Sequence, residues 1–178
     1  RNRPEVCSGS YRSSLMNSAT RIWICRDRSA DIGRKTYVMG ILNVTPDSFS
    51  DGGRYFDCAA ATEHALAMHA DGADIIDVGG ESTRPGAESV SVDEEIARTV
   101  PVIRELASRT DCLISIDTMK GETARVALKA GAHIVNDVSA GRYSSEMPRI
   151  VREHGAGVVL MHILGMPRTM QKKPEYED

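Results

Sequence analysis

Polar side chains that suit metal and anion binding follow the first two of five short apolar runs in the chain. Asn43 and Asp51 after the first run offer the oxygen atoms that Mg²⁺ prefers. Thr83 and Arg84 after the second run place a hydroxyl beside a guanidinium, a pair suited to holding a phosphate or a carboxylate. These residues therefore predict a site for an anion together with magnesium.

Three more polar groups follow the later apolar runs. Asp117 can accept hydrogen bonds from a pair of N–H groups, and the Asn136 amide can both donate and accept, which suits a polar heterocycle. Each of them is equally open to a purely structural interpretation, as the N-cap of the helix that follows it. His162 is the one histidine at a predicted strand end, whereas His64 and His69 lie five apart on a predicted helix and are expected to be solvated.

The elements that would position these groups alternate along the chain. Apolar runs rich in Val and Ile, apolar on both faces as in a buried parallel sheet, are predicted strands, at 38–44, 73–78, 113–116, 132–135 and 157–161. The segments between them have helical spacing, at 58–70, 92–108, 120–130 and 145–154. Before the first of these strands, Ile22–Cys25 and Thr36–Val38 are predicted to form a short hairpin.

Helix boundaries are marked by several residues. Ser91 and Glu94 have the spacing of a capping box at the start of the second helix. Gly131 predicts the end of the third helix. Pro148 is expected to interrupt the fourth.

Repeated strand–helix units predict an α/β fold with a parallel sheet, for which two architectures are open. A five-stranded doubly wound sheet would be complete at 178 residues. A (β/α)₈ TIM barrel runs to about 250 residues and would be truncated after strand five. Polar groups after every strand favour the barrel, because all its strand ends meet at one rim, whereas an open sheet uses only those at its switch point.

Composition narrows the class of protein. The 22 basic and 25 acidic side chains give a net charge of −3, so no basic excess is present for nucleic-acid binding. The chain has no apolar run of the roughly 18 residues that span a bilayer. Four widely spaced cysteines predict reduced thiols and a cytoplasmic location. Residues 1–20, rich in Arg and Ser, are predicted to be a disordered tail or linker, or part of an organellar transit peptide, ahead of one domain at 21–178.

Five segments resemble the signatures of the dihydropteroate synthase family, in the family's order. The first two are long and specific, MGILNVTPDSFSDGG at 39–53 and GADIIDVGGESTRPG at 72–86. The other three are ISIDT at 114–118, GAHIVNDV at 131–138, and the segment from Met161-His162 to Met170-Gln171. The resemblance covers residues 21–178 and implies a pterin-binding (β/α)₈ barrel.

Enzymes of that family join 6-hydroxymethyl-7,8-dihydropterin diphosphate to p-aminobenzoate in folate biosynthesis and are sulfonamide targets. The resemblance implies substrate contacts from Asp117, Asn136 and His162, with Asp117 and Arg84 acting in catalysis. It also implies magnesium held by Asn43 and Asp51. Thr83 and Arg84 would bind the pyrophosphate and, with Pro85 and Phe49, form the edge of the p-aminobenzoate site.

The family pattern also contains parts on strands six to eight that have no counterpart up to Asp178. We therefore expect the 178-residue polypeptide alone to be inactive and to aggregate or fold only in part. An inactive fragment is one alternative; a pterin-binding methyltetrahydrofolate:corrinoid methyltransferase is another, disfavoured by the TPDSFS and STRPG segments. The resemblance further implies a homodimer that binds neither nucleic acid nor membranes.

Overall fold

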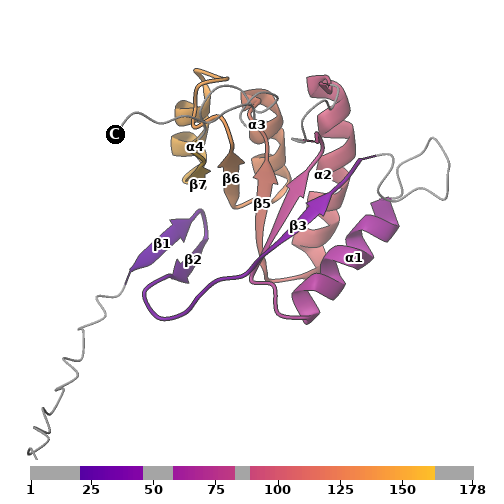
Figure 1. The fold of residues 1–178 in the computed structure, drawn as a ribbon, viewed down its shortest axis with the longest axis vertical. Coiled ribbons are helices and arrows are strands. Elements are labelled where there is room, and N and C mark those ends of the chain that lie inside the picture. The colour runs from indigo at the N-terminus through magenta and orange to yellow at the C-terminus, as the bar shows by residue number, and fades with distance from the viewer. Residues whose placement is uncertain (1–20, 46–57, 83–88, 163–178) are drawn as a thin grey trace, which may run out of the picture.

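The computed structural model describes residues 21–45, 58–82 and 89–162. Figure 1 shows the arrangement of their strands and helices. The strands are β1 (Ile22–Cys25), β2 (Arg28–Asp31), β3 (Met39–Asn43), β4 (Ile75–Gly79), β5 (Leu113–Asp117), β6 (Ile134–Asp137) and β7 (Gly157–Leu160). The helices are α1 (Cys58–Ala70), α2 (Val92–Arg109), α3 (Gly121–Ala130) and α4 (Met147–His154). Among the described helices, none combines the length and the apolar character that a bilayer crossing requires.

The large sheet has its strands in chain order. Its five strands run β3-β4-β5-β6-β7, and every neighbouring pair is parallel. A doubly wound sheet reverses its strand order at a switch point, so this order excludes that architecture. Four consecutive βα units and a fifth strand, all wound in one direction, confirm the prediction of a (β/α) barrel architecture.

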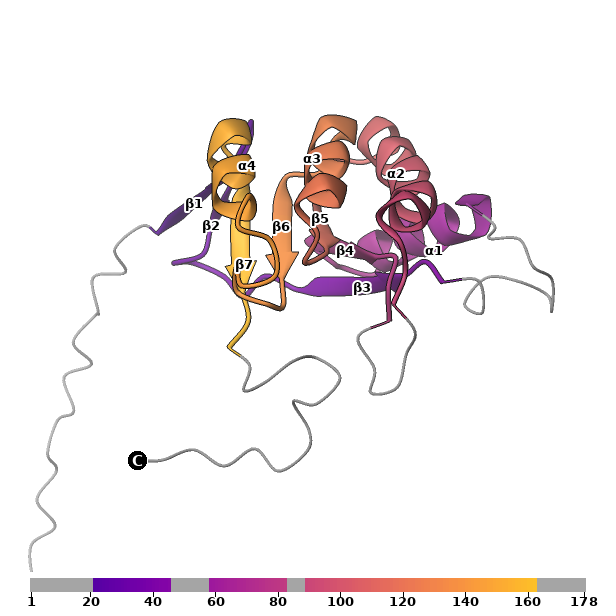
Figure 2. The same cartoon turned by 90° about the horizontal axis from the view of Figure 1, so that it is seen from above.

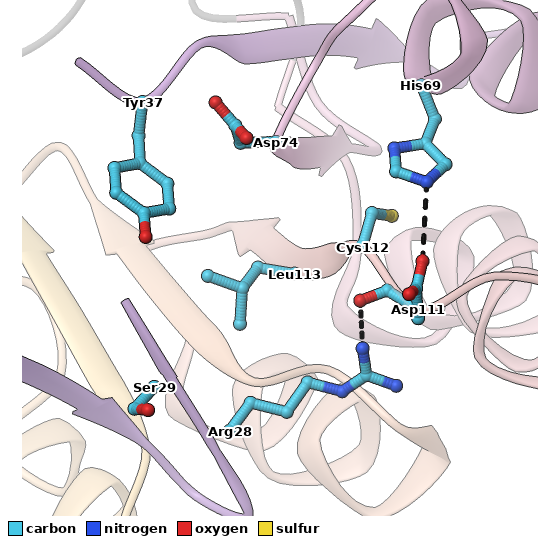
Figure 3. A pocket seen from close by; sticks show the side chains of 8 residues that line it. All are labelled: Arg28, Ser29, Tyr37, His69, Asp74, Asp111, Cys112 and Leu113. Atoms are coloured by element: carbon cyan, nitrogen blue, oxygen red, sulfur yellow. Dashed lines mark hydrogen bonds and ion pairs between the residues drawn. The ribbon is translucent and has the colours of Figure 1, made fainter. Parts of the chain in front are cut away.

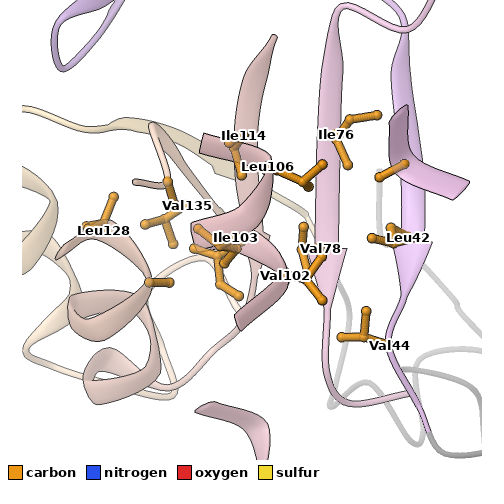
Figure 4. Packing of buried hydrophobic residues seen from close by; sticks show 14 of the residues in the cluster. Leu42, Val44, Ile76, Val78, Val102, Ile103, Leu106, Ile114, Leu128 and Val135 are labelled. Atoms are coloured by element: carbon orange, nitrogen blue, oxygen red, sulfur yellow. The ribbon is translucent and has the colours of Figure 1, made fainter. Parts of the chain in front are cut away.

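All four helices pack on one face of this sheet (Figure 2). Alternate residues of the strands point to that face, where they meet the apolar sides of the helices (Figure 4). The buried cluster combines strand residues with residues of α2 and α3: Leu42, Ile76, Val78, Ile114, Ile116, Val135, Val102, Ile103, Leu106 and Leu128. The opposite face therefore corresponds to the lumen of a barrel.

The predicted helix boundaries are confirmed at two ends and corrected at a third. Ser91 is the N-cap of α2 and accepts a hydrogen bond from Glu94 N at 3.2 Å, although the Glu94 carboxylate pairs with Arg98. Gly131 ends α3 with a φ of 125°, a conformation that glycine adopts without strain. Pro148 does not interrupt α4: it lies in the first turn, where its missing N–H would have no partner in the helix.

The hairpin differs from the prediction. β1 pairs with β2, so Thr36–Val38 is not its second strand. The turn between the strands is Arg26-Asp27, with Arg26 at a φ of 62°. A tight turn that uses a non-glycine residue in this conformation has no signature in the sequence. Tyr37 instead packs beside the hairpin, where its hydroxyl accepts a hydrogen bond from Asp31 N at 2.9 Å.

The β1–β2 hairpin covers the N-terminal end of the lumen face. Cys25 and Ala30 are buried in one cluster with Ile75, Leu113 and Ile134 of the large sheet. The Arg26 guanidinium donates to two backbone carbonyls, Leu128 O at 2.8 Å and Ala132 O at 2.7 Å. Figure 1 shows the hairpin next to β7, with which β1 is in contact. The N-terminal end of the lumen is thus closed by packing, and the carboxyl end bears the polar residues.

Candidate active site

One row of residues crosses the carboxyl edge of the sheet on its lumen face. Strand pairing places Asn43 beside Gly79, Gly79 beside Asp117, and Asp117 beside Asn136. The row therefore unites three of the side chains singled out in the sequence, from β3, β5 and β6. Neighbouring strands lie about 4.8 Å apart, so adjacent side chains of the row are close enough to contact one small heterocycle together.

Gly79 leaves space in the middle of this row. A Cβ atom at Gly79 would lie 3.5 Å from Asp117 Oδ2 and 3.8 Å from Asn43 Oδ1. The two oxygens thus flank the same space, which any side chain on β4 would occupy. The glycine keeps that space open between an amide and a carboxylate.

A second polar layer lies two residues deeper along the strands. Asp77 and Ser115 are paired neighbours there, and both are buried. Asn136 Nδ2 donates to Asp77 Oδ2 at 2.9 Å, which links the two layers. Among the described residues, Asp77 Oδ1 and Ser115 Oγ have no hydrogen-bond partner.

The electrostatics of the site are dominated by carboxylates. Burial raises the pKa of Asp117 to about 7, and the negative charges of Asp77 and Glu95 act in the same direction. Burial also raises the pKa of Asp77. A site of this kind disfavours further negative charge and favours a cationic ligand or transition state.

Lys120 is the cation buried within this acidic region. Its Nζ donates to Glu95 Oε2 at 3.0 Å and pairs with Glu81. Thr123 Oγ1 donates to the same oxygen of Glu95 at 2.9 Å. Because Glu81 lies two residues before Thr83, the cluster fixes the start of the segment that carries Thr83 and Arg84. Arg98 supports the same segment by donating to Gly80 O at 2.8 Å.

Several predicted site residues can now be placed. Neither Asp117 nor Asn136 caps a helix: the N-cap position of α3 is Lys120, and that of α4 is Glu146. His162 is exposed, two residues beyond the end of β7. The remaining predictions fall outside the described residues: Phe49, Asp51, Thr83, Arg84 and Pro85.

The family model of pterin binding enzymes matches residues 39–178. The chain belongs to the pterin-binding enzyme family. Its match includes all five strands of the large sheet and the whole polar row. The resemblance seen in the signature segments is thereby confirmed.

Related pterin-binding enzymes share both sequence and fold with the chain. A dihydropteroate synthase of Synechocystis sp. is 52% identical over 148 residues, which are 83% of this chain and 51% of the relative. A Yersinia pestis dihydropteroate synthase, solved as a sulfonamide drug complex, has a TM-score of 0.79 at 44% identity, covering 89% of this chain and 57% of that one. The Burkholderia cenocepacia enzyme complexed with 7,8-dihydropteroate has a TM-score of 0.74 at 39% identity, with 88% and 52% covered. The chain therefore spans about half the length of these relatives.

The part of this pterin-binding chain that the structure describes contains no cluster of three or more His, Cys, Asp or Glu residues able to hold a metal ion. Magnesium needs no such cluster, because it keeps several waters and binds through one or two protein oxygens together with substrate phosphates. The Asn43 amide oxygen, exposed at the end of β3 and facing the space above Gly79, fits that requirement.

Two parts of the candidate site were not predicted from the sequence. Asp77 was not singled out as a site residue, although it lies within the predicted strand at 73–78 and in the middle of β4, a strand that is buried throughout. A charged residue within such an apolar run is itself a signal of a specific buried contact. Lys120, Glu95 and Thr123 carry no motif, and their association depends on how α2 packs against α3.

A hollow of about 400 Å³ lies at the other end of the sheet (Figure 3). Its polar groups bind one another: Arg28 pairs with the Asp111 carbonyl, and His69 Nε2 lies 3.5 Å from Asp111 Oδ1. His69 Nδ1 also lies 2.8 Å from Ala73 O, so this histidine is not simply solvated as expected. These contacts join the hairpin to the sheet and have a structural role.

Proposed function

We propose that this protein is a dihydropteroate synthase. It would join 6-hydroxymethyl-7,8-dihydropterin diphosphate to p-aminobenzoate and release pyrophosphate, in folate biosynthesis. The observation that carries the proposal is the polar row on the lumen face, in which Asp117 and Asn136 are neighbours beside the space kept open by Gly79. The names of the related enzymes support the same activity.

Asp117 and Asn136 are the proposed contacts of the pterin ring. A carboxylate accepts from adjacent N–H groups, and an amide both donates and accepts, which together match the edge of an aminopyrimidinone. Breaking the C–O bond to the diphosphate places positive charge on the pterin methylene. The carboxylates around Asp117 favour that charge, so the site would stabilise the transition state more than the substrate.

The departing anion and the second substrate would be held above the pterin. We propose that Asn43 and Asp51 hold Mg²⁺, which would neutralise charge on the pyrophosphate. Thr83 and Arg84 would bind the same anion. Pro85 and Phe49 would border the p-aminobenzoate site, and His162 would contact substrate from the end of β7.

The wider setting follows the family. We propose a homodimeric, cytoplasmic enzyme, organellar if residues 1–20 belong to a transit peptide, that is inhibited by sulfonamides and uses neither nucleic acid nor membranes as partners. Analytical ultracentrifugation of the full-length protein tests the dimer.

The test of the activity is calorimetry of the full-length protein with pyrophosphate and Mg²⁺, followed by a coupled assay of dihydropteroate formation. We expect binding that depends on Mg²⁺, and turnover that Asp117→Asn lowers by about 10²-fold or more, the usual loss when a transition-state contact is removed. Asp74→Asn, a carboxylate at the opposite end of β4, is the matched control and should retain activity. Absence of pyrophosphate binding, with methyl transfer from methyltetrahydrofolate instead, would overturn the proposal.

A further inference from the structure

The Asn136 amide is held from below by a buried carboxylate. Asp77 is only 3% exposed, and its Oδ2 accepts a hydrogen bond from Asn136 Nδ2 at 2.9 Å. Asp77 lies on the neighbouring layer of the lumen face, beneath the row that contains Asn136 and Asp117. The contact joins β4 to β6, which are separated in the sheet by β5.

The chemistry of the two groups determines which of them donates and which accepts in this hydrogen bond. An amide can turn by 180° and exchange its donor and acceptor ends, whereas an ionised carboxylate only accepts. With Asp77 beneath it, the amide must turn its NH₂ group toward the carboxylate. The reversed orientation would bring the carbonyl oxygen against the carboxylate oxygen, with both of them removed from water.

We propose that Asp77 is a positioning residue that fixes the orientation of the Asn136 amide, so that Asn136 Oδ1 is presented to the ligand as an acceptor. The inference rests on the proposed function, because it assigns a ligand contact to Asn136. The inference adds the class of ligand group that Asn136 would select. Asn136 would bind an N–H donor of a heterocycle in preference to a ring nitrogen or a carbonyl oxygen, which are acceptors.

Ser115 separates this role from a general effect of the polar layer. It is paired with Asp77 and fully buried; its hydroxyl acts on the Asp77 carboxylate and lowers the pKa of that group, but it has no hydrogen bond to Asn136. A change at Ser115 therefore alters the same layer without removing the contact to Asn136. Ser115→Ala is the matched control.

Asp77→Asn is the informative variant because it preserves size and one acceptor oxygen. An amide at this position could pair with Asn136 in either orientation, so the preference would be lost while the fold is kept. Loss of the competent orientation raises the apparent dissociation constant in proportion. We expect the Kd for pteroic acid, measured by calorimetry on the full-length protein, to rise about twofold, the factor for an amide divided equally between two orientations.

A double-mutant cycle decides whether Asp77 acts through Asn136. In an Asn136→Ala background, Asp77→Asn should change the Kd for pteroic acid by less than about 1.5-fold, since the amide that it orients is gone. Ser115→Ala should leave the Kd unchanged. Equal losses from Asp77→Asn in both backgrounds would overturn the proposal and leave Asp77 a purely structural role.

A measurement without ligand keeps this inference separate from the proposed function. In the unliganded protein, NMR should show one slowly exchanging Asn136 NH₂ proton, and Asp77→Asn should speed its exchange about tenfold or more. Failure of the unmodified protein to bind pteroic acid would contradict the function, whereas fast exchange in the unmodified protein would contradict the positioning role.

Discussion

Asp117 holds its proton at a pH where most aspartates have lost theirs. Its pKa of about 7 arises first from burial and then from the charges of Asp77, Glu95, Asp137 and Glu81. At neutral pH the protein therefore tolerates an unfavourable charge at the position where a pterin cation would be stabilised. Residues of this kind trade stability of the empty protein for binding of a charged transition state.

This trade predicts a pH-dependent effect of Asp117→Asn. The unfolded carboxyl ionises near pH 4 and the folded one near 7, so the stability contributed by the protonated form is present below pH 4 and lost as pH rises through 7. An asparagine at position 117 does not ionise, so the variant does not lose this stability as pH rises. We expect the variant to be more stable than the unmodified protein by about 4 kcal/mol at pH 8 and nearly equal in stability at pH 4, measured by urea unfolding.

His133 titrates in the same range but cancels from this comparison. Burial lowers its pKa to about 4, and its Nδ1 accepts a hydrogen bond from Ile114 N at 3.1 Å. Both proteins carry this histidine, so it shifts their unfolding curves together. A stability difference that is independent of pH would contradict the assignment of the raised pKa to Asp117.

At the residue scale, the sequence predicts which residues belong to the site better than it predicts which residues contact one another. Asn43, Asp117 and Asn136 were found because each lies at the end of an apolar run. Asp77 and Lys120 were not, because their roles depend on strand register and helix packing, which bring together residues 59 and 25 positions apart in the chain. No local pattern encodes such contacts.

At the scale of elements, Lys120 connects three parts of the fold. It lies at the N-cap position of α3, pairs with Glu95 of α2 and pairs with Glu81 after β4. Glu95 is 1% exposed, so removal of the ammonium would leave a buried carboxylate without its cation.

Lys120→Met should therefore be strongly destabilising. We expect a loss of about 3–5 kcal/mol in the free energy of unfolding, the usual effect of removing one partner of a buried ion pair. Lys129→Met, an exposed lysine near the end of the same helix, is the control and should change stability by less than about 0.5 kcal/mol. If the two substitutions lower the free energy of unfolding by similar amounts in chemical denaturation, the Lys120–Glu95 ion pair contributes no more than an exposed lysine does.

The hairpin gives a second prediction at this scale. A Cβ at Gly157 would lie 2.6 Å from Cys25 Sγ and 2.9 Å from the Trp23 ring, so Gly157→Ala must displace the hairpin from β7. We expect a loss of about 1–3 kcal/mol, typical of overpacking, with increased proteolysis near Arg26. Gly40→Ala meets the flexible Met68 side chain at 3.2 Å and should cost less. Unchanged protease sensitivity of Gly157→Ala would contradict the close packing.

Elements with a local sequence signal were predicted well, and those defined by a turn were not. The ranges of α1 to α3 agree with prediction to within a residue, because an Ala-rich composition marks α1, and apolar spacing and end residues mark α2 and α3. The second strand of the hairpin, Arg28–Asp31, has the sequence RSAD, which is not typical of a strand. It forms because Arg26 accepts an uncommon backbone conformation and because Ala30 is buried against the sheet.

On the scale of the whole molecule, the described sheet has two strands with a single neighbour, β3 and β7. Each bears a large apolar side chain in contact with water: Ile41 is 65% exposed and Leu160 is 57% exposed. Strand edges with such side chains pair readily with other chains. The 178-residue polypeptide by itself therefore presents two strand edges that favour association with other chains.

We expect this polypeptide to self-associate when it is expressed alone. Ile41→Ser combined with Leu160→Lys should reduce the associated fraction severalfold in size-exclusion chromatography with light scattering, because the edges lose apolar area and gain charge. Tyr143→Ser, a change at a 55% exposed side chain in the segment between β6 and α4 and outside both edge strands, should have little effect. A monomeric, fully folded unmodified polypeptide would contradict this expectation.

The covered N-terminal end of the lumen also limits the directions from which a ligand can reach the polar row. Since the hairpin packs over that end, the polar row is open to a ligand from the carboxyl ends of the described strands, beside Asn43. A ligand seated against Asp117 and Asn136 would have the hairpin-covered end of the sheet beneath it and the carboxyl ends of the strands above it. The hairpin, at the far end of the strands from the polar row, would thus decide from which side a ligand is reached.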